Sequence, residues 1–143
     1  MVSKSDVIVL IGPMGVGKST VGKKLANSIG VNFRDTDSIF VKEHGAITDY
    51  FDTHGEEAFR KIEEQIVADA ISVAGVVATG GGAVLSAKTR ERLRNATVVY
   101  LATDGTHMAK RLSQGSRPLL KNGLADWNRI YAERKPIYAE IAD

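Results

Sequence analysis

A glycine-rich stretch near the N-terminus has the residue types and spacing of a phosphate-binding loop. Residues 12–19 read Gly-Pro-Met-Gly-Val-Gly-Lys-Ser and match the pattern G-x-x-x-x-G-K-[ST]. Glycines let backbone N–H groups approach phosphate oxygens, and a helix beginning at the end of the loop adds a field that favours anions. In this pattern the lysine reaches the β- and γ-phosphates of a nucleoside triphosphate, and the serine hydroxyl binds Mg²⁺. The predicted nucleotide-binding residues here are Gly15, Val16, Gly17, Lys18, Ser19 and Thr20.

Two carboxylates, those of Asp35 and Asp37, follow a short apolar segment. At the end of a strand, this i, i+2 spacing places both side chains on the same side. Phosphoryl transfer uses one carboxylate near the magnesium ion and another that accepts the proton of the attacking hydroxyl. An alternative is that Asp37 only caps a helix beginning at Ser38. The pair alone leaves both interpretations open.

Three consecutive glycines, Gly80 to Gly82, follow an expected strand at 76–79. Ligands of α/β proteins bind at the carboxyl ends of the strands, and bare backbone permits a close approach. A tight turn is the alternative, but one glycine would suffice for it. The run therefore favours a ligand contact.

Several arginines could recognise or neutralise an anion. Arg60 and Glu63 are three residues apart on an expected helix, so the carboxylate can hold the guanidinium, although a surface ion pair of little energetic value has the same spacing. Arg117 lies in the polar segment 113–123, which is long enough to form a lid. Arg134 falls in the last expected helix.

The elements that must position these residues alternate between strands and helices, which predicts an α/β domain with a parallel sheet. The β-branched run at 7–11 predicts a strand buried on both faces. Pro136 predicts a kink or restart inside the last helix. Further strands are expected at 31–35, 76–79 and 97–101, and helices at 18–29, 38–44, 56–73, 88–94, a segment ending near 112, and 124 onward, with a helical turn at 47–51.

Composition narrows the class of protein. A chain of 143 residues with 43% apolar residues is expected to form a single domain spanning 1–143. The absence of cysteine excludes disulfides and Cys-ligated metal centres, and the short apolar runs predict neither a signal peptide nor a membrane span. The basic segment 88–121 has no regular alternation of basic and aromatic residues, so nucleic-acid binding is not expected. A cytoplasmic enzyme fits these features.

The motifs together resemble those of shikimate kinases, and the resemblance covers nearly the whole chain. They occur in the family's order at 12–19, 35–37, 59–63, 79–84, 117–120 and 134–138. The resemblance implies a three-layer α/β/α P-loop kinase fold with a central parallel sheet, related to nucleoside monophosphate kinases. It also implies ATP-dependent phosphorylation of the 3-hydroxyl of shikimate, in aromatic amino-acid biosynthesis. A monomer with a substrate-binding region at about 36–62 and a lid at about 113–123 is expected.

On the acceptor side, the resemblance assigns roles residue by residue. Asp37 binds shikimate and takes the proton from the reacting hydroxyl. Arg60 and Arg134 bind the substrate carboxylate, and Gly81 and Gly82 contact the substrate through backbone N–H groups. Arginines suit a carboxylate and a carboxylate suits a hydroxyl, so this division is chemically consistent.

On the nucleotide side, the resemblance implies that Lys18 and the loop amides bind the phosphates. Ser19 binds Mg²⁺ and Asp35 supports the ion through water. Arg117 closes over the phosphates with the lid, as a third catalytic residue beside Lys18 and Asp37. Arg111 matches a family arginine that stacks on adenine.

The chain departs from the family's pattern at its end. It stops at residue 143 within the last expected helix, where the family continues with a strand, a turn against adenine and a closing helix. We therefore expect a C-terminal strand and helix to be missing, leaving one sheet edge uncovered and the adenine pocket short of a wall. Two rival functions stay open: a sister P-loop kinase such as a gluconate kinase, and a kinase-like regulator that binds without turnover.

Overall fold

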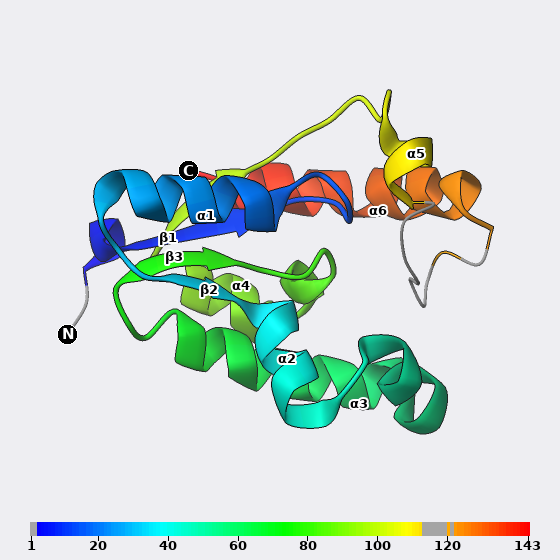
Figure 1. The fold of residues 1–143 in the computed structure, drawn as a ribbon, viewed down its shortest axis with the longest axis horizontal. Coiled ribbons are helices and arrows are strands. Elements are labelled where there is room, and N and C mark those ends of the chain that lie inside the picture. The colour runs from blue at the N-terminus through cyan, green and yellow to red at the C-terminus, as the bar shows by residue number, and fades with distance from the viewer. Residues whose placement is uncertain (1–2, 113–119, 121) are drawn as a thin grey trace.

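A parallel four-stranded sheet forms the centre of the molecule (Figure 1). The computed structural model describes residues 3–112, 120 and 122–143. The strand order is β2-β3-β1-β4, and β1 lies between β3 and β4, with Val9 opposite Val77 and Val98. The strands are β1 (Val7–Ile11), β2 (Phe33–Asp35), β3 (Gly75–Ala78) and β4 (Thr97–Tyr100).

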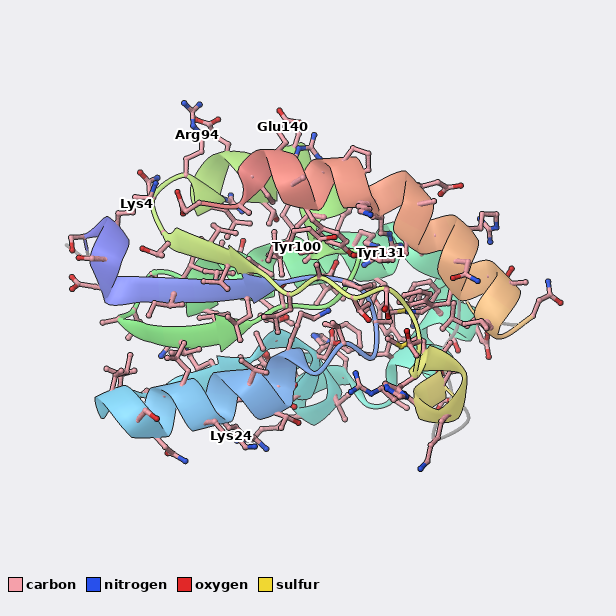
Figure 2. All side chains as sticks on the ribbon, turned by 90° about the horizontal axis from the view of Figure 1, so that it is seen from above. Lys4, Lys24, Arg94, Tyr100, Tyr131 and Glu140 are labelled. Carbon is pink, nitrogen blue, oxygen red and sulfur yellow. The ribbon has the colours of Figure 1, made fainter. Side chains whose placement is uncertain are left out.

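Helices cover both faces of the sheet, as the three-layer prediction requires. The helices are α1 (Lys18–Ile29), α2 (Thr36–His44), α3 (Ile47–Ala70), α4 (Ala87–Leu93), α5 (Met108–Leu112) and α6 (Leu124–Ile141), with 3₁₀ turns η1 (Lys4–Asp6) and η2 (Ala83–Leu85). Because side chains alternate along a strand, Leu10 packs with Ala26 of α1 on one face, and Val9 packs with Trp127 of α6 on the other. Figure 2 shows α1 and α6 on opposite sides of the sheet.

Tyrosines join α6 to the sheet. Tyr131 of α6 meets Tyr100 of β4, with their hydroxyl oxygens 2.5 Å apart (Figure 2). Tyr138 lies about two turns further along the same helix and is fully buried, with its ring centroid 5.3 Å from that of Tyr100. The last helix is therefore fixed against the central strands through aromatic packing as well as through aliphatic contacts.

Three expectations about the elements need correction. The expected turn at 47–51 and helix at 56–73 are present as two helical segments of α3 separated by a kink at Gly55, whose φ of 84° is accessible mainly to glycine, but the second segment ends at Ala70 and not at 73. Helix α2 begins at Thr36, before the expected Ser38. No restart occurs at Pro136, because α6 continues through it; a proline removes only one N–H donor, and buried residues anchor the helix on both sides of it.

The predicted lid at 113–123 falls largely outside the described residues, and Arg117 lies outside them. No helix in the part of the chain that the structure describes is long and apolar enough to cross a bilayer.

Candidate active site

The phosphate loop joins the end of β1 to the start of α1, the strand–loop–helix context that the motif needs. Gly12, Gly15 and Gly17 adopt φ values of 149°, 79° and 103°. A Cβ on Gly12 would lie 2.5 Å from the carbonyl oxygen of Leu101, so this position also lacks space for a side chain. The Lys18 amine donates to the carbonyl oxygens of Gly12 (2.5 Å) and Pro13 (3.1 Å). The Lys18 side chain is thus folded over its own loop.

Two distant elements support this loop. The Nε1–H of Trp127, at the start of α6, donates to the carbonyl of Met14 over 2.8 Å. Arg111 of α5 donates from Nη1 to the carbonyl of Gly15 over 2.9 Å. Arg111 therefore lies beside the nucleotide loop, and its stacking on adenine stays a prediction. Trp127 carried no motif signal in the sequence, beyond its place at the start of an apolar helix face.

The two carboxylates after β2 take different structural positions. Asp35 ends the strand and is the N-cap of α2, accepting from the backbone N–H groups of Asp37 (2.9 Å) and Ser38 (3.1 Å). The alternative that Asp37 is the cap is therefore wrong, because the helix begins at Thr36, two residues earlier than expected. Asp37 stands in the first turn of α2, and not on the strand end that the i, i+2 argument assumed. Both carboxylates nevertheless line one cavity of about 480 Å³ with Ser19.

The oxygens beside the phosphate loop suit a magnesium ion that is mostly bound by water and phosphate. The Ser19 hydroxyl donates to Asp35 Oδ2, so the two predicted metal residues are in direct contact. Among the described residues, no group of three or more His, Cys, Asp or Glu side chains could hold a metal ion alone. Mg²⁺ sites at phosphates commonly use one or two protein oxygens, which this arrangement offers.

A second cavity, of about 400 Å³, lies where α2, α3, the β3–η2 loop and α6 meet, and we call it the acceptor pocket. It brings together every acceptor-side residue that the sequence predicted. Two arginines and two carboxylates are among its lining residues, and most of the other lining side chains are apolar. The lining residues are Met14, Asp37, Val41, Ala46, Ile47, Thr48, Phe51, Phe59, Arg60, Glu63, Gly80, Gly81, Gly82 and Arg134. Such a pocket suits a small anion that also carries hydroxyl groups.

Arg60 is held in place by two carboxylates of its own helix. Its Nη1 donates to Glu63 Oε1 over 2.8 Å, and its Nε donates to Glu56 Oε2 over 3.2 Å. Its guanidinium carbon lies 5.2 Å from the centroid of the Phe59 ring. Because Glu63 is only 5% exposed, the alternative of a surface ion pair is wrong. The i, i+4 spacing of Glu56 and Arg60 could have indicated the second partner.

Burial dominates the electrostatics of this pocket. Burial raises the pKa of the Glu63 carboxyl, which the Arg60 charge opposes and the neighbouring Asp37 carboxylate reinforces. Burial also lowers the pKa of Arg134, whose side chain is nearly inaccessible to water. An anionic ligand between the two guanidinium groups would offset part of this desolvation.

Each glycine of the triplet makes room for a different part of the pocket. A Cβ on Gly82 would lie 2.5 Å from Arg60 Cζ, and one on Gly80 would lie 2.9 Å from Glu63 Oε2. A Cβ on Gly81 would lie 3.2 Å from Met14 Cγ. The triplet therefore lets charged side chains lie directly on the backbone, a requirement that a tight turn alone would not impose.

Tyr138 is hydrogen-bonded to the backbone of the glycine triplet. Its hydroxyl donates to the carbonyl of Gly81 over 2.5 Å. Burial raises the pKa of Tyr138 to about 12, so the hydroxyl keeps its proton across the neutral range. The sequence showed this tyrosine only as part of the 134–138 motif.

Comparison with known proteins agrees with this geometry. A family model described as shikimate kinase matches residues 14–143. The shikimate kinase of Streptomyces coelicolor is 44% identical over 142 residues, which cover 96% of this chain and 83% of that protein. The solved structure of shikimate kinase from Acinetobacter baumannii in complex with shikimate has a TM-score of 0.92 at 37% identity, covering 98% of this chain and 82% of that one.

A gluconokinase from Sinorhizobium meliloti 1021 is a more distant structural neighbour. Its TM-score is 0.51 at 18% identity, over 99% of this chain and 95% of that one, which is a likeness of fold alone. The family match over residues 14–143 and the identity to the Streptomyces coelicolor enzyme lead to one conclusion: this chain belongs to the shikimate kinase family.

Proposed function

We propose that this chain phosphorylates the 3-hydroxyl of shikimate with ATP, giving shikimate 3-phosphate and ADP. The observation that supports this most directly is the acceptor pocket, in which Arg60, Arg134 and Asp37 line one cavity beside Met14 of the phosphate loop. Two guanidinium groups suit a carboxylate, and a carboxylate at the opening toward the phosphate site suits a reacting hydroxyl. Shikimate has both groups.

The reaction divides between the two cavities. Asp37 and Val41 line both of them, and only Asp37 of these two can accept a proton, so it is able to contact an acceptor hydroxyl and face the nucleotide site at once. We assign it the proton of that hydroxyl as the oxygen bonds to the γ-phosphorus and the bond to the bridging oxygen of ADP breaks. Lys18 and the loop amides would hold the phosphate charge, and Arg117 would neutralise the transferring group.

Magnesium belongs to the nucleotide side of this proposal. Ser19 would bind the ion and Asp35 would support it through water, because their oxygens are in contact beside the loop. When bound, Mg²⁺ neutralises the charge that develops on the phosphate oxygens.

On the acceptor side, we propose that Arg60 and Arg134 bind the shikimate carboxylate and that Gly81 and Gly82 donate backbone hydrogen bonds. The burial of Arg134 and the two carboxylates on Arg60 keep both guanidinium groups oriented before the substrate arrives. Pre-oriented charges lose less conformational entropy on binding. A monomer located in the cytoplasm completes the proposal; gel filtration with light scattering and cell fractionation would test those two points.

The deciding experiment measures ADP release by the 143-residue chain with MgATP and, in separate reactions, shikimate, gluconate, nucleoside monophosphates or no acceptor. We expect ADP release with shikimate and with none of the other acceptors. The Lys18→Ala variant, prepared in the same way, measures the ADP released by contaminating kinases. Turnover with gluconate would favour the sister-kinase alternative. Shikimate binding in calorimetry without any ADP release would favour the regulator.

A further inference from the structure

Helix α6 contacts both loops of the predicted reaction centre through two aromatic side chains to which the proposed reaction assigns no role. Its buried face carries Trp127, Tyr131, Arg134 and Tyr138. Trp127 reaches the phosphate loop, and Tyr138 reaches the glycine triplet. The two residues are eleven positions apart, which is about three helical turns or about 16 Å along the axis. One rigid element thus connects two loops that are distant in sequence.

The contact at the phosphate loop fixes the direction of one peptide group. Trp127 Nε1 donates to the Met14 carbonyl, which belongs to the Met14–Gly15 peptide. The peptide is trans, so its N–H, that of Gly15, points away from the carbonyl and from Trp127. Within the described part of the chain, no protein acceptor takes this N–H. It is therefore free to donate to a phosphate oxygen, in a direction that Trp127 holds.

The contact at the glycine triplet has the same construction. The Tyr138 hydroxyl donates to the Gly81 carbonyl, and the N–H of that trans peptide belongs to Gly82. Among the described residues this N–H also has no protein acceptor. Because Tyr138 is fully buried and burial raises its pKa to about 12, the hydroxyl keeps the proton of this bond across the neutral pH range.

We propose that α6 sets the relative placement of nucleotide and acceptor, with Trp127 as the positioning residue for the Gly15 N–H and Tyr138 as the positioning residue for the Gly82 N–H. The inference rests on the proposed function, since it treats these N–H groups as ligand donors. Each aromatic residue then affects one substrate. A purely structural role of the same helix would affect both substrates equally or neither.

The chain contains a matched control on the same helix face. Tyr131 is buried like Tyr138. Its hydroxyl, however, bonds to the Tyr100 hydroxyl and accepts from the Thr103 N–H, and among the described residues it is not hydrogen-bonded to either loop. Tyr138→Phe and Tyr131→Phe each remove one buried hydroxyl while keeping the ring, and Trp127→Phe removes the indole N–H while keeping an aromatic side chain. The three variants separate loop positioning from loss of core packing.

The test is a steady-state comparison of these variants with the parent chain, after the parent has shown shikimate-dependent ADP release. For Tyr138→Phe, we expect the KM for shikimate to rise about five- to tenfold, as for one lost hydrogen bond. The KM for ATP should stay within about twofold of the parent value. For Trp127→Phe, the same rise in the KM for MgATP with the shikimate KM unchanged is expected. Tyr131→Phe should change neither constant, although it lowers thermal stability.

Equal changes in both constants in every variant, or a change for Tyr131→Phe as large as for Tyr138→Phe, would overturn the proposal. Should a variant not fold, amide hydrogen exchange in the parent chain decides the matter. Shikimate should protect the Gly82 N–H, and MgADP should protect the Gly15 N–H. Absence of that protection with both ligands bound would also overturn it, whereas a parent chain that binds neither ligand nor turns over shikimate would refute the proposed function instead.

Discussion

The phosphate loop and the acceptor pocket are built in different ways. The loop is one continuous segment, residues 12–19, and its chemistry depends mainly on backbone N–H groups that glycines leave accessible. The acceptor pocket draws its polar residues from α2, α3, the β3–η2 loop and α6, which span almost 100 positions of the chain. The first site is local and the second is assembled by the fold.

Because the phosphate loop and the acceptor pocket are built differently, they should tolerate different substitutions. A backbone site depends on the conformations of a few glycines and on what holds the loop from outside. A side-chain site depends on ion pairs and close packing between elements, as Arg60 shows with Glu56, Glu63 and Gly82. Substitutions in the acceptor pocket should therefore act on shikimate and leave ATP binding intact, and the predictions below test that separation.

The largest effect is expected at Asp37, the ionisable residue that lines both cavities. Asp37→Asn keeps the size of the side chain and removes the proton acceptor, so kcat should fall by roughly 10²–10⁴-fold with a modest change in the KM for shikimate. Steady-state kinetics with both substrates varied would measure this. An unchanged kcat would remove Asp37 from the chemical step.

Arg60→Ala should come next and act on binding. Loss of a charged hydrogen-bond set costs about 1.5–3 kcal/mol, which corresponds to roughly 10- to 150-fold weaker binding of shikimate. Calorimetric titration of shikimate would measure it, with MgATP binding as the internal reference.

Arg94→Ala is the matched control for this substitution. Arg94 also pairs with a glutamate three residues away on its own helical segment, but that pair is exposed. Arg94, labelled in Figure 2, follows the last residue of α4 and is not among the residues that line the acceptor pocket. Exposed pairs contribute little, so no change is expected. Normal saturation of Arg60→Ala with shikimate would contradict the assignment of the carboxylate site.

A smaller effect is expected from Gly82→Ala. The new methyl group would meet Arg60 Cζ at 2.5 Å, and the end of that flexible side chain must move away. The KM for shikimate should rise about tenfold while the KM for ATP stays constant, in line with one displaced charged contact. In the Arg60→Ala background the same substitution should have little further effect, because the clash is gone. Additive effects in the double variant would show that Gly82 acts independently of Arg60.

The smallest predicted effect concerns stability and pH. Burial raises the folded-state pKa of the Glu63 carboxyl above its ordinary value, so its contribution to stability is fully present below the unfolded-state pKa and is lost as pH rises through the folded-state pKa. Glu63→Gln removes this titration. In urea denaturation, the free energy of unfolding of the parent relative to Glu63→Gln should therefore fall as pH rises above the ordinary pKa of a glutamate carboxyl. A difference that stays constant or grows with pH would contradict the raised pKa.

Much of the fold follows from local patterns. The expected strand at 7–11 and the expected helix at 18–29 are confirmed at both ends, because a β-branched run, a phosphate loop and a helix-ending Gly30 mark the boundaries. The expected separation of a turn at 47–51 from a helix at 56–73 is also confirmed, because Gly55 interrupts the helical conformation between them. Asp35 was missed as the cap of α2, because Asp37 has the same residue type and lies within a turn of it.

The sequence by itself determined the phosphate loop, the residue types of the acceptor site and the family. These features depend on backbone conformation and on motif order, both of which are properties of the chain read in one dimension. Other features are visible only in the folded chain. Glu63 is buried beside the charged groups of Arg60, Asp37 and Arg134. Each glycine of the triplet makes room for a particular side chain, and Trp127 and Tyr138 hold the two loops. Such contacts join residues up to 113 positions apart, and their energies depend on burial and direction, which spacing along the chain does not specify.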